Sequence, residues 1–177
     1  MLMKARALAL LALTLSACGQ SGAERYAGYW QQQGGRKDGT IMEIRQEGSN
    51  YFFRENMLSE NDRQYVLSEK NGELVLEPPR GGLPFKLSDD GQSLYFANYH
   101  LQRIDAATKD KIVAHHENCE KLADEFSKAK EALPNQRDQA AKNALIQQYS
   151  ARFAELEQER KCRNKPFDLT ARPAMEW

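Results

Sequence analysis

Apolar and polar residues alternate in short runs through residues 28–104, and pairs of turn-forming residues separate these runs. Asn71-Gly72 is the strongest of the pairs, because its residue types suit a type I′ turn between two strands. A two-residue loop there fixes the register of a hairpin, with the pairs Lys70–Glu73, Ser68–Val75, Glu69–Leu74 and Leu67–Leu76. The leucines would face the core, and Lys70 and Glu73 would form an ion pair outside it.

Similar signals continue along the same segment. Asp90-Gly91 predicts a second hairpin, and residues 47–50 predict a longer loop between strands at 40–46 and 51–55. Roughly six to eight short strands without helical periodicity favour an antiparallel meander. A meander of this length forms a curled sheet or a small, partly closed barrel.

Aromatic residues in these strands raise a separate question. Tyr51, Phe52 and Phe53 are consecutive, so at least one ring must point away from the core of a one-sided sheet. Either helices cover a closed or two-sided sheet, or exposed rings line an apolar groove for a ligand or partner. The candidate aromatic residues for the core or for such a ligand site are Trp30, Tyr51, Phe53 and Tyr95.

A helical pattern begins at Asp105, which can cap a helix. From there to Leu133 the chain has neither Gly nor Pro, and apolar positions recur every three or four residues. This face consists of Ile112, His115, Cys119, Leu122, Phe126, Ala129 and Leu133. Pro134 ends the helix, and Asn135 can cap a second one. The apolar face of the second helix consists of Leu145, Tyr149, Phe153 and Leu156. We expect a helical hairpin that packs on itself or on the sheet.

The first 17 residues differ from the rest of the chain. Lys4 and Arg6 precede an apolar run at 7–13, which small residues follow, and this order is typical of a secretory signal peptide. The run is shorter than the about 20 apolar residues that a membrane-spanning helix needs. We therefore expect this segment to direct export of the chain.

Residues 15–18, Leu-Ser-Ala-Cys, resemble the lipobox of bacterial lipoproteins. The resemblance implies cleavage before Cys18, a diacylglyceryl thioether on its sulfur and acylation of the new N-terminus. Two or more acyl chains give stable membrane anchoring. Gly19 stands where an aspartate would favour retention in the inner membrane, so the resemblance implies an outer-membrane protein that faces the periplasm.

The predicted fold class is α+β, with an antiparallel β-meander followed by a helical hairpin. The predicted segments are a signal peptide at 1–17, a lipidated tether at 18–27, a β domain at 28–104, a helical hairpin at 105–163 and a tail at 164–177.

Charge narrows the classes of partner. The 177 residues include 25 Lys+Arg and 25 Asp+Glu, so the net charge is zero. A nucleic-acid binder needs a basic face that neutralises phosphates, so nucleic acid is not an expected partner. Lys4 and Arg6 lie in the signal peptide, which has no acidic residue, so the remaining chain is slightly acidic.

Cys119 and Cys162 remain after lipidation of Cys18, and an oxidising compartment favours a disulfide between them. Two straight helices that meet at Pro134 would offset these cysteines by about 12 residues, or roughly 18 Å. A disulfide requires Cα atoms only about 4.4–6.8 Å apart. A break in the second helix near Asn143, an end of that helix before Cys162, or a bond between two molecules would remove the offset. We predict the intramolecular bond, with a broken second helix.

The sequence contains no recognisable catalytic motif. His115 and Cys119 are one helical turn apart, but no third residue lies at a sequence spacing typical of a metal site. A histidine packed in the core is therefore the favoured interpretation of His115. The chain has no G-x-S-x-G motif and no glycine-rich phosphate loop. We therefore predict no enzymatic activity, no cofactor and no metal. The leading hypothesis is a non-catalytic protein that contacts another envelope protein in the periplasm.

Gly28-Tyr29-Trp30 is similar to the G-x-W at the start of lipocalins, in which the tryptophan plugs one end of the barrel. The similarity implies an alternative function, a small lipocalin-like barrel that binds a lipid or a hydrophobic small molecule. An internal cavity would favour this alternative, whereas a filled core with an exposed apolar helix stripe would favour binding of a protein partner.

Overall fold

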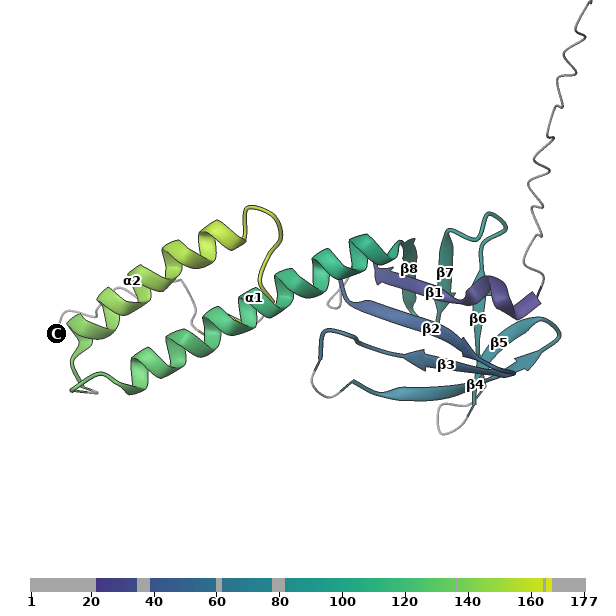
Figure 1. Ribbon diagram of the computed structural model, residues 1–177, viewed down its shortest axis with the longest axis horizontal. Helices are drawn as coiled ribbons and strands as arrows, with labels where there is room; N and C mark the ends of the chain where they lie inside the picture. Colours follow the sequence, from purple (N-terminus) through teal and green to yellow (C-terminus); the bar gives the residue numbers. More distant parts are fainter. Residues whose placement is uncertain are drawn as a thin grey trace, which may run out of the picture.

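The computed structural model describes residues 22–34, 39–59, 62–77, 82–135, 137–163 and 165–166. Eight antiparallel strands form a closed barrel, and two helices follow it (Figure 1). The strands are β1 (Gly28–Gln32), β2 (Ile41–Glu47), β3 (Asn50–Arg54), β4 (Gln64–Lys70), β5 (Glu73–Leu76), β6 (Leu83–Leu87), β7 (Ser93–Phe96) and β8 (Tyr99–Ile104). The predicted signal peptide and Cys18 lie outside the described residues.

The hairpin of β4 and β5 has the predicted register. Its strand pairs are Leu67–Leu76, Ser68–Val75, Glu69–Leu74 and Lys70–Glu73. Asn71 and Gly72 both have positive φ, at 54° and 80°, as a type I′ turn requires. The predicted ion pair is wrong, because Lys70 Nζ lies 2.6 Å from the carboxylate of Glu77 instead.

The barrel closes fully, whereas the sequence favoured a curled sheet or a partly closed barrel. Closure depends on β1, which pairs with β2 on one side and with β8 on the other. The predicted longer loop after β2 is also wrong, because Glu47 pairs directly with Asn50 across a two-residue turn. Gly48 has φ of +61° in this turn, a conformation that glycine adopts without steric cost.

Apolar side chains fill the inside of the barrel. Phe53, Phe85 and Phe96 pack together, with ring centroids 4.1–5.5 Å apart. The other buried members of this cluster are Ala23, Tyr26, Trp30, Met42, Ile44, Tyr51, Leu67, Leu74, Leu76, Leu94 and Leu101. Six of the side chains that line the interior have no exposed surface at all: Trp30, Met42, Leu74, Phe85, Leu94 and Leu101.

A 3₁₀ helix, η1 (Gly22–Tyr26), precedes the barrel and packs Ala23 and Tyr26 into its core. This part of the expected tether therefore belongs to the barrel. Burial of Ala23 and Tyr26 is favourable because both residues present apolar surface to the core. In addition, Trp30 Nε1 donates a hydrogen bond to the Tyr26 carbonyl at 3.0 Å.

Arg103 of β8 joins η1 to the barrel. Its guanidinium carbon lies 4.2 Å from the centroid of the Trp30 ring, a cation–π contact. The guanidinium also donates to the carbonyls of Arg25 at 2.5 Å, Ala27 at 2.8 Å and Gly91 at 2.7 Å. Burial, and secondarily the charge of Arg25, lower the pKa of Arg103.

Two helices, α1 (Ala106–Glu131) and α2 (Gln139–Leu156), form the predicted hairpin, which extends away from the barrel so that α2 returns beside α1 (Figure 1). Asp105 caps α1 as predicted and accepts a hydrogen bond from Thr108 N at 2.6 Å. The cap of α2 is Asp138, not Asn135. The predicted break near Asn143 is wrong, because α2 is continuous.

The apolar faces of α1 and α2 cover each other. Their shared core consists of Cys119, Leu122, Phe126, Tyr149, Phe153 and Cys162. The stripe on α1 is therefore not an exposed apolar surface. Neither helix, within the part of the chain that the structure describes, is long and apolar enough to cross a membrane.

Candidate functional site

A disulfide joins the hairpin at the end that lies nearer the barrel. Cys119 and Cys162 have Sγ atoms 2.07 Å apart and Cα atoms 5.7 Å apart. The offset of straight helices disappears because α2 ends at Leu156, six residues before Cys162, and the chain then leaves the helical path.

The segment after α2 is held in place by Glu157. One of its carboxylate oxygens accepts a hydrogen bond from Cys162 N at 3.2 Å, and the other pairs with Lys165 Nζ at 2.5 Å. Together with the disulfide, these contacts fix residues 160–163 against α1.

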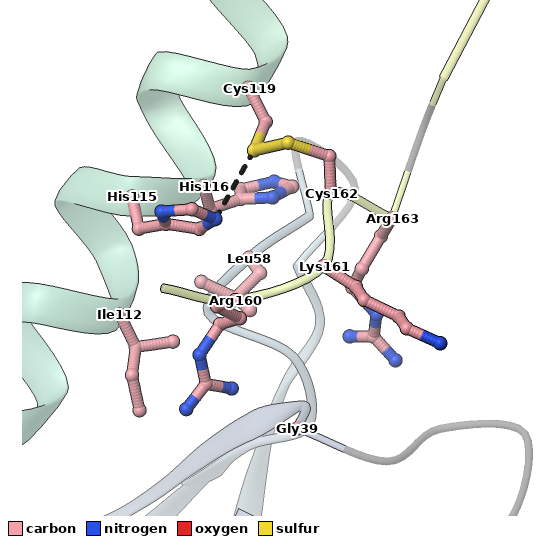
Figure 2. A pocket seen from close by; sticks show the side chains of 10 residues that line it. All are labelled: Gly39, Leu58, Ile112, His115, His116, Cys119, Arg160, Lys161, Cys162 and Arg163. Atoms are coloured by element: carbon pink, nitrogen blue, oxygen red, sulfur yellow. Dashed lines mark hydrogen bonds between the residues drawn. A yellow bond between two sulfur atoms is a disulfide. The ribbon is translucent and has the colours of Figure 1, made fainter. Parts of the chain in front are cut away.

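A cavity of about 320 Å³ lies between this segment, α1 and the rim of the barrel (Figure 2). Gly39 and Leu58 are the barrel residues that line it. The other lining residues are Ile112, His115, His116, Cys119, Arg160, Lys161, Cys162 and Arg163. Among the described residues, the lining thus includes three cations and two histidines but no carboxylate.

The two arginines of the cavity reach the barrel. With its amide oxygen oriented toward Arg160, Gln31 accepts hydrogen bonds from both terminal nitrogens of that guanidinium, at 3.1 and 3.2 Å. Gly39 leaves room for this contact, because a Cβ at that position would lie 3.0 Å from Arg160 Nη1. Arg163 Nη1 donates to Thr40 Oγ1 at 2.8 Å. Both acceptors are neutral, so the positive charges are not balanced by them.

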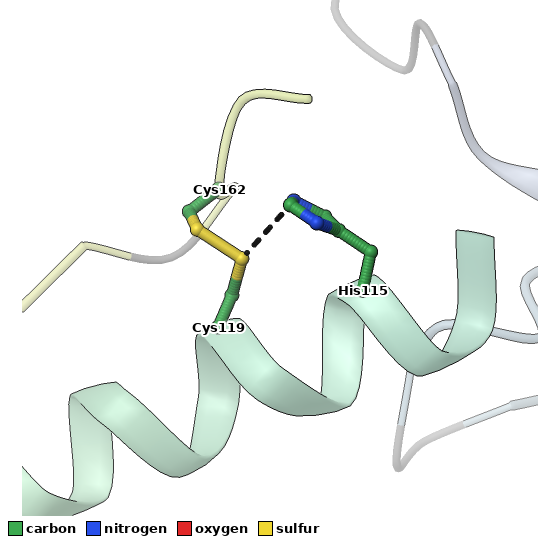
Figure 3. A group of neighbouring side chains, drawn as sticks. All are labelled: His115, Cys119 and Cys162. Carbon is green, nitrogen blue, oxygen red and sulfur yellow. Dashed lines mark hydrogen bonds between the residues drawn. A yellow bond between two sulfur atoms is a disulfide. The ribbon is translucent and has the colours of Figure 1, made fainter. Parts of the chain in front are cut away.

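His115 lines the cavity beside the disulfide. Its Nε2 is 3.4 Å from Cys119 Sγ, and the residue is buried, as the favoured interpretation of a packed histidine expected (Figure 3). Two carboxylates approach the histidines from outside the lining: Glu159 lies 4.0 Å from His115 Nδ1, and Glu120 lies 3.9 Å from His116 Nε2.

His115, Cys119 and Cys162 also form a group of metal-ligand types, with their ligand atoms within 4.8 Å of one another (Figure 3). Sequence spacing alone offered no third ligand for His115 and Cys119, whereas the fold supplies Cys162. A metal binds the thiolate form of cysteine. The disulfide removes both thiolates, so the oxidised site is not suited to a metal ion.

The candidate aromatic residues do not reach this cavity. Trp30, Tyr51 and Phe53 belong to the barrel core. Tyr95 was expected to serve the core or a ligand site, but 47% of its surface is exposed and it stacks on His100 outside the barrel, at 4.9 Å between centroids. Its neighbours in β7, Leu94 and Phe96, face inward, so the alternation of the strand turns Tyr95 outward.

Sequence reasoning missed the cationic members of the cavity. Arg160, Lys161 and Arg163 surround Cys162 in the run Arg-Lys-Cys-Arg, and this run was the available signal. The expected disulfide would have placed these cations beside His115 on α1. Comparisons of the chain with protein families, curated proteins and solved structures found no match.

Proposed function

We propose that the protein is a non-catalytic outer-membrane lipoprotein that faces the periplasm and binds a protein of the cell envelope at the cavity between its barrel and its hairpin. The lipobox supports anchoring through Cys18. The cavity supports the binding role, because both parts of the molecule contribute to it and three cations gather in its lining.

The filled interior of the barrel is the observation that favours a protein partner over a lipid or hydrophobic small molecule bound inside the barrel. A side chain that borders a ligand-sized space would have surface accessible to water. Trp30, Phe85 and Leu101 have none, and they lie on three different strands. The closed barrel and its buried Trp30 fit a lipocalin-like shape, but the described interior favours recognition on the outer surface.

The hairpin does not present the exposed apolar stripe that was expected of a surface for a protein partner. Its apolar faces are covered by each other, so the surface that it offers to a partner is polar and charged. Recognition at such a surface depends on complementary charge and on hydrogen bonds more than on apolar area.

Site-specific photo-crosslinking in cells that express the full chain tests the proposal. A benzophenone amino acid replaces Glu159, whose side chain is 85% exposed beside the cavity, or Lys86, which is exposed on β6. We expect a discrete adduct with one envelope protein from position 159 and none from position 86. The same adducts from both positions, or none from position 159, would overturn the proposal.

The anchor is tested separately by metabolic labelling with an alkyne-bearing fatty acid. The wild-type chain should be labelled and should sediment with outer membranes, whereas Cys18→Ala should be neither labelled nor retained. Labelling that persists in Cys18→Ala would contradict the proposed lipid attachment.

A further inference from the structure

Three cations line the cavity, and two carboxylates nearby, of Glu159 and Glu120, face its histidines instead. The cations are Arg160, Lys161 and Arg163, and the lining residues that the structure describes include no carboxylate. Within the described parts of the chain, none of these three side chains forms an ion pair. The chain as a whole has no net charge, so this concentration of cations is a local feature.

Each arginine retains hydrogen-bonding capacity toward the cavity. A guanidinium has five N–H donors in a planar fork. Arg160 uses its two terminal nitrogens toward Gln31, and Arg163 uses one toward Thr40, so donors remain on both groups. Arginine forks match carboxylate oxygens in geometry as well as in charge.

The cationic segment is held in one conformation before any partner arrives. The disulfide joins Cys162 to α1, and the carboxylate of Glu157 accepts from the Cys162 backbone. A site that is ordered in advance loses less entropy on binding, so its affinity is higher for the same contacts.

The three cations do not converge on one point, although both arginines reach the barrel. The Arg160 guanidinium points toward Gly39 at the barrel rim, whereas Lys161 extends to the other side of the segment (Figure 2). A compact phosphate group would meet only part of this set. Several carboxylates spaced along an extended chain match charges that are spread in this way.

We infer that the cavity binds an acidic segment of the partner protein, with carboxylates of that segment seated on Arg160, Lys161 and Arg163. This inference rests on the proposed function, because it names the chemistry of the partner at the same site. Attraction between charges of opposite sign would also speed the encounter of the two proteins and would weaken as salt rises.

Fluorescence anisotropy of the full chain in detergent tests this inference with a labelled hexaglutamate peptide as the probe. We expect the hexaglutamate to bind and the matching hexaglutamine peptide not to bind. Arg160→Gln/Arg163→Gln should weaken binding by roughly tenfold or more, because charge-assisted bonds are lost. Lys86→Gln/Lys128→Gln removes the same charge from exposed positions away from the cavity and should change affinity by less than about twofold.

Lys161→Gln is a second variant that leaves the contacts of the arginines with the barrel intact. It should weaken binding of hexaglutamate by roughly threefold, as the loss of one exposed cation predicts. Equal losses in the cavity variants and in the control would show general charge attraction and would overturn the inference. Equal binding of both peptides, or full displacement of hexaglutamate by equimolar inorganic phosphate, would also overturn it.

The outcomes separate this inference from the proposed function. If purified protein does not bind hexaglutamate while position 159 still crosslinks to one envelope protein, only the acidic-segment inference fails. If hexaglutamate binds through the arginines while no adduct forms in cells, the inference that the cavity binds acidic segments is retained. The proposed binding of an envelope protein at this site then fails.

Discussion

Replacement of Arg103 by methionine should destabilise the barrel by about 3 kcal/mol. The guanidinium donates three hydrogen bonds to backbone carbonyls and lies on the face of Trp30. At about 1.5 kcal/mol for each bond from a charged donor, the three bonds stabilise the fold by about 4–5 kcal/mol. The contact with Trp30 adds about 1 kcal/mol.

A part of this stabilisation is offset in the wild-type protein. The charge of Arg103 is partly buried without a carboxylate beside it, and removal of an unpaired charge from a partly buried position regains about 2 kcal/mol. Methionine has a similar length and keeps the apolar contact with Trp30. The net loss of folding stability is therefore that of the three hydrogen bonds and the cation–π contact, reduced by the regained cost of the buried charge.

Urea unfolding, followed by tryptophan fluorescence, measures this loss. Arg45→Met is the matched control, because Arg45 also lies over an aromatic ring, that of Phe52 at 5.5 Å, but its ion pair with Glu47 is largely solvent-exposed. We expect the control to change the free energy of unfolding by less than about 1 kcal/mol. If Arg103→Met were as stable as Arg45→Met, the assigned role of the guanidinium in joining η1 to the barrel would be wrong.

Three further changes test other parts of the structure. Cys162→Ser should lower the free energy of unfolding by about 2–4 kcal/mol in urea titrations followed by circular dichroism, because the disulfide closes a loop between residues 43 positions apart. Gly28→Ala should lower the midpoint of thermal unfolding, because its Cβ would lie 2.7 Å from Arg103 Nη1 at a φ of +141°. Hydrogen bonds from Thr108 lower the pKa of Asp105, so its cap stabilises α1 above the ordinary aspartate range and is lost as pH falls through the lowered value. The protection of the Thr108 amide against exchange, relative to the intrinsic rate at each pH, should therefore fall on acidification, and Asp105→Asn should remove most of that pH dependence.

Each of these tests has its own control. Reduction of the wild-type protein by dithiothreitol should reproduce the effect of Cys162→Ser, and a smaller effect of reduction would point to a packing defect in the variant. Gly48→Ala keeps a left-handed φ of +61°, close to that of Ala97 in this chain, and its Cβ meets no atom within 4 Å, so it should be less destabilising than Gly28→Ala. Protection of the Thr108 amide that stays constant across the acid range would contradict the capping role of Asp105.

Local signals in the sequence specified much of the fold. Asn71-Gly72 determined both the turn and the register of β4 and β5, because a two-residue loop permits one set of pairs. The spacing of apolar residues placed both helices and their contacting faces. These features depend on residues close together in the chain, where turn geometry and helical periodicity act directly.

Features that depend on distant residues were not predicted. Closure of the barrel requires Trp30 of β1 to pair with Arg103 of β8, and no pattern within either strand specifies that pairing. The cavity was missed for a similar reason. Its cations are adjacent in sequence, but only the end of α2 at Leu156 and the bond to Cys119 bring them to the rim of the barrel.

The pairing of β1 with β8 has a consequence for the order in which the chain folds. Contacts between residues distant in sequence form slowly, because the intervening chain must lose its freedom before the contact is made. The first strand cannot gain its second neighbour until residue 104 is available, and its exposed edge can pair with other chains until then. The helices make mostly local contacts and fold quickly. The strand that is synthesised first is therefore among the last to be completed, and the period before closure is when the protein is most exposed to aggregation.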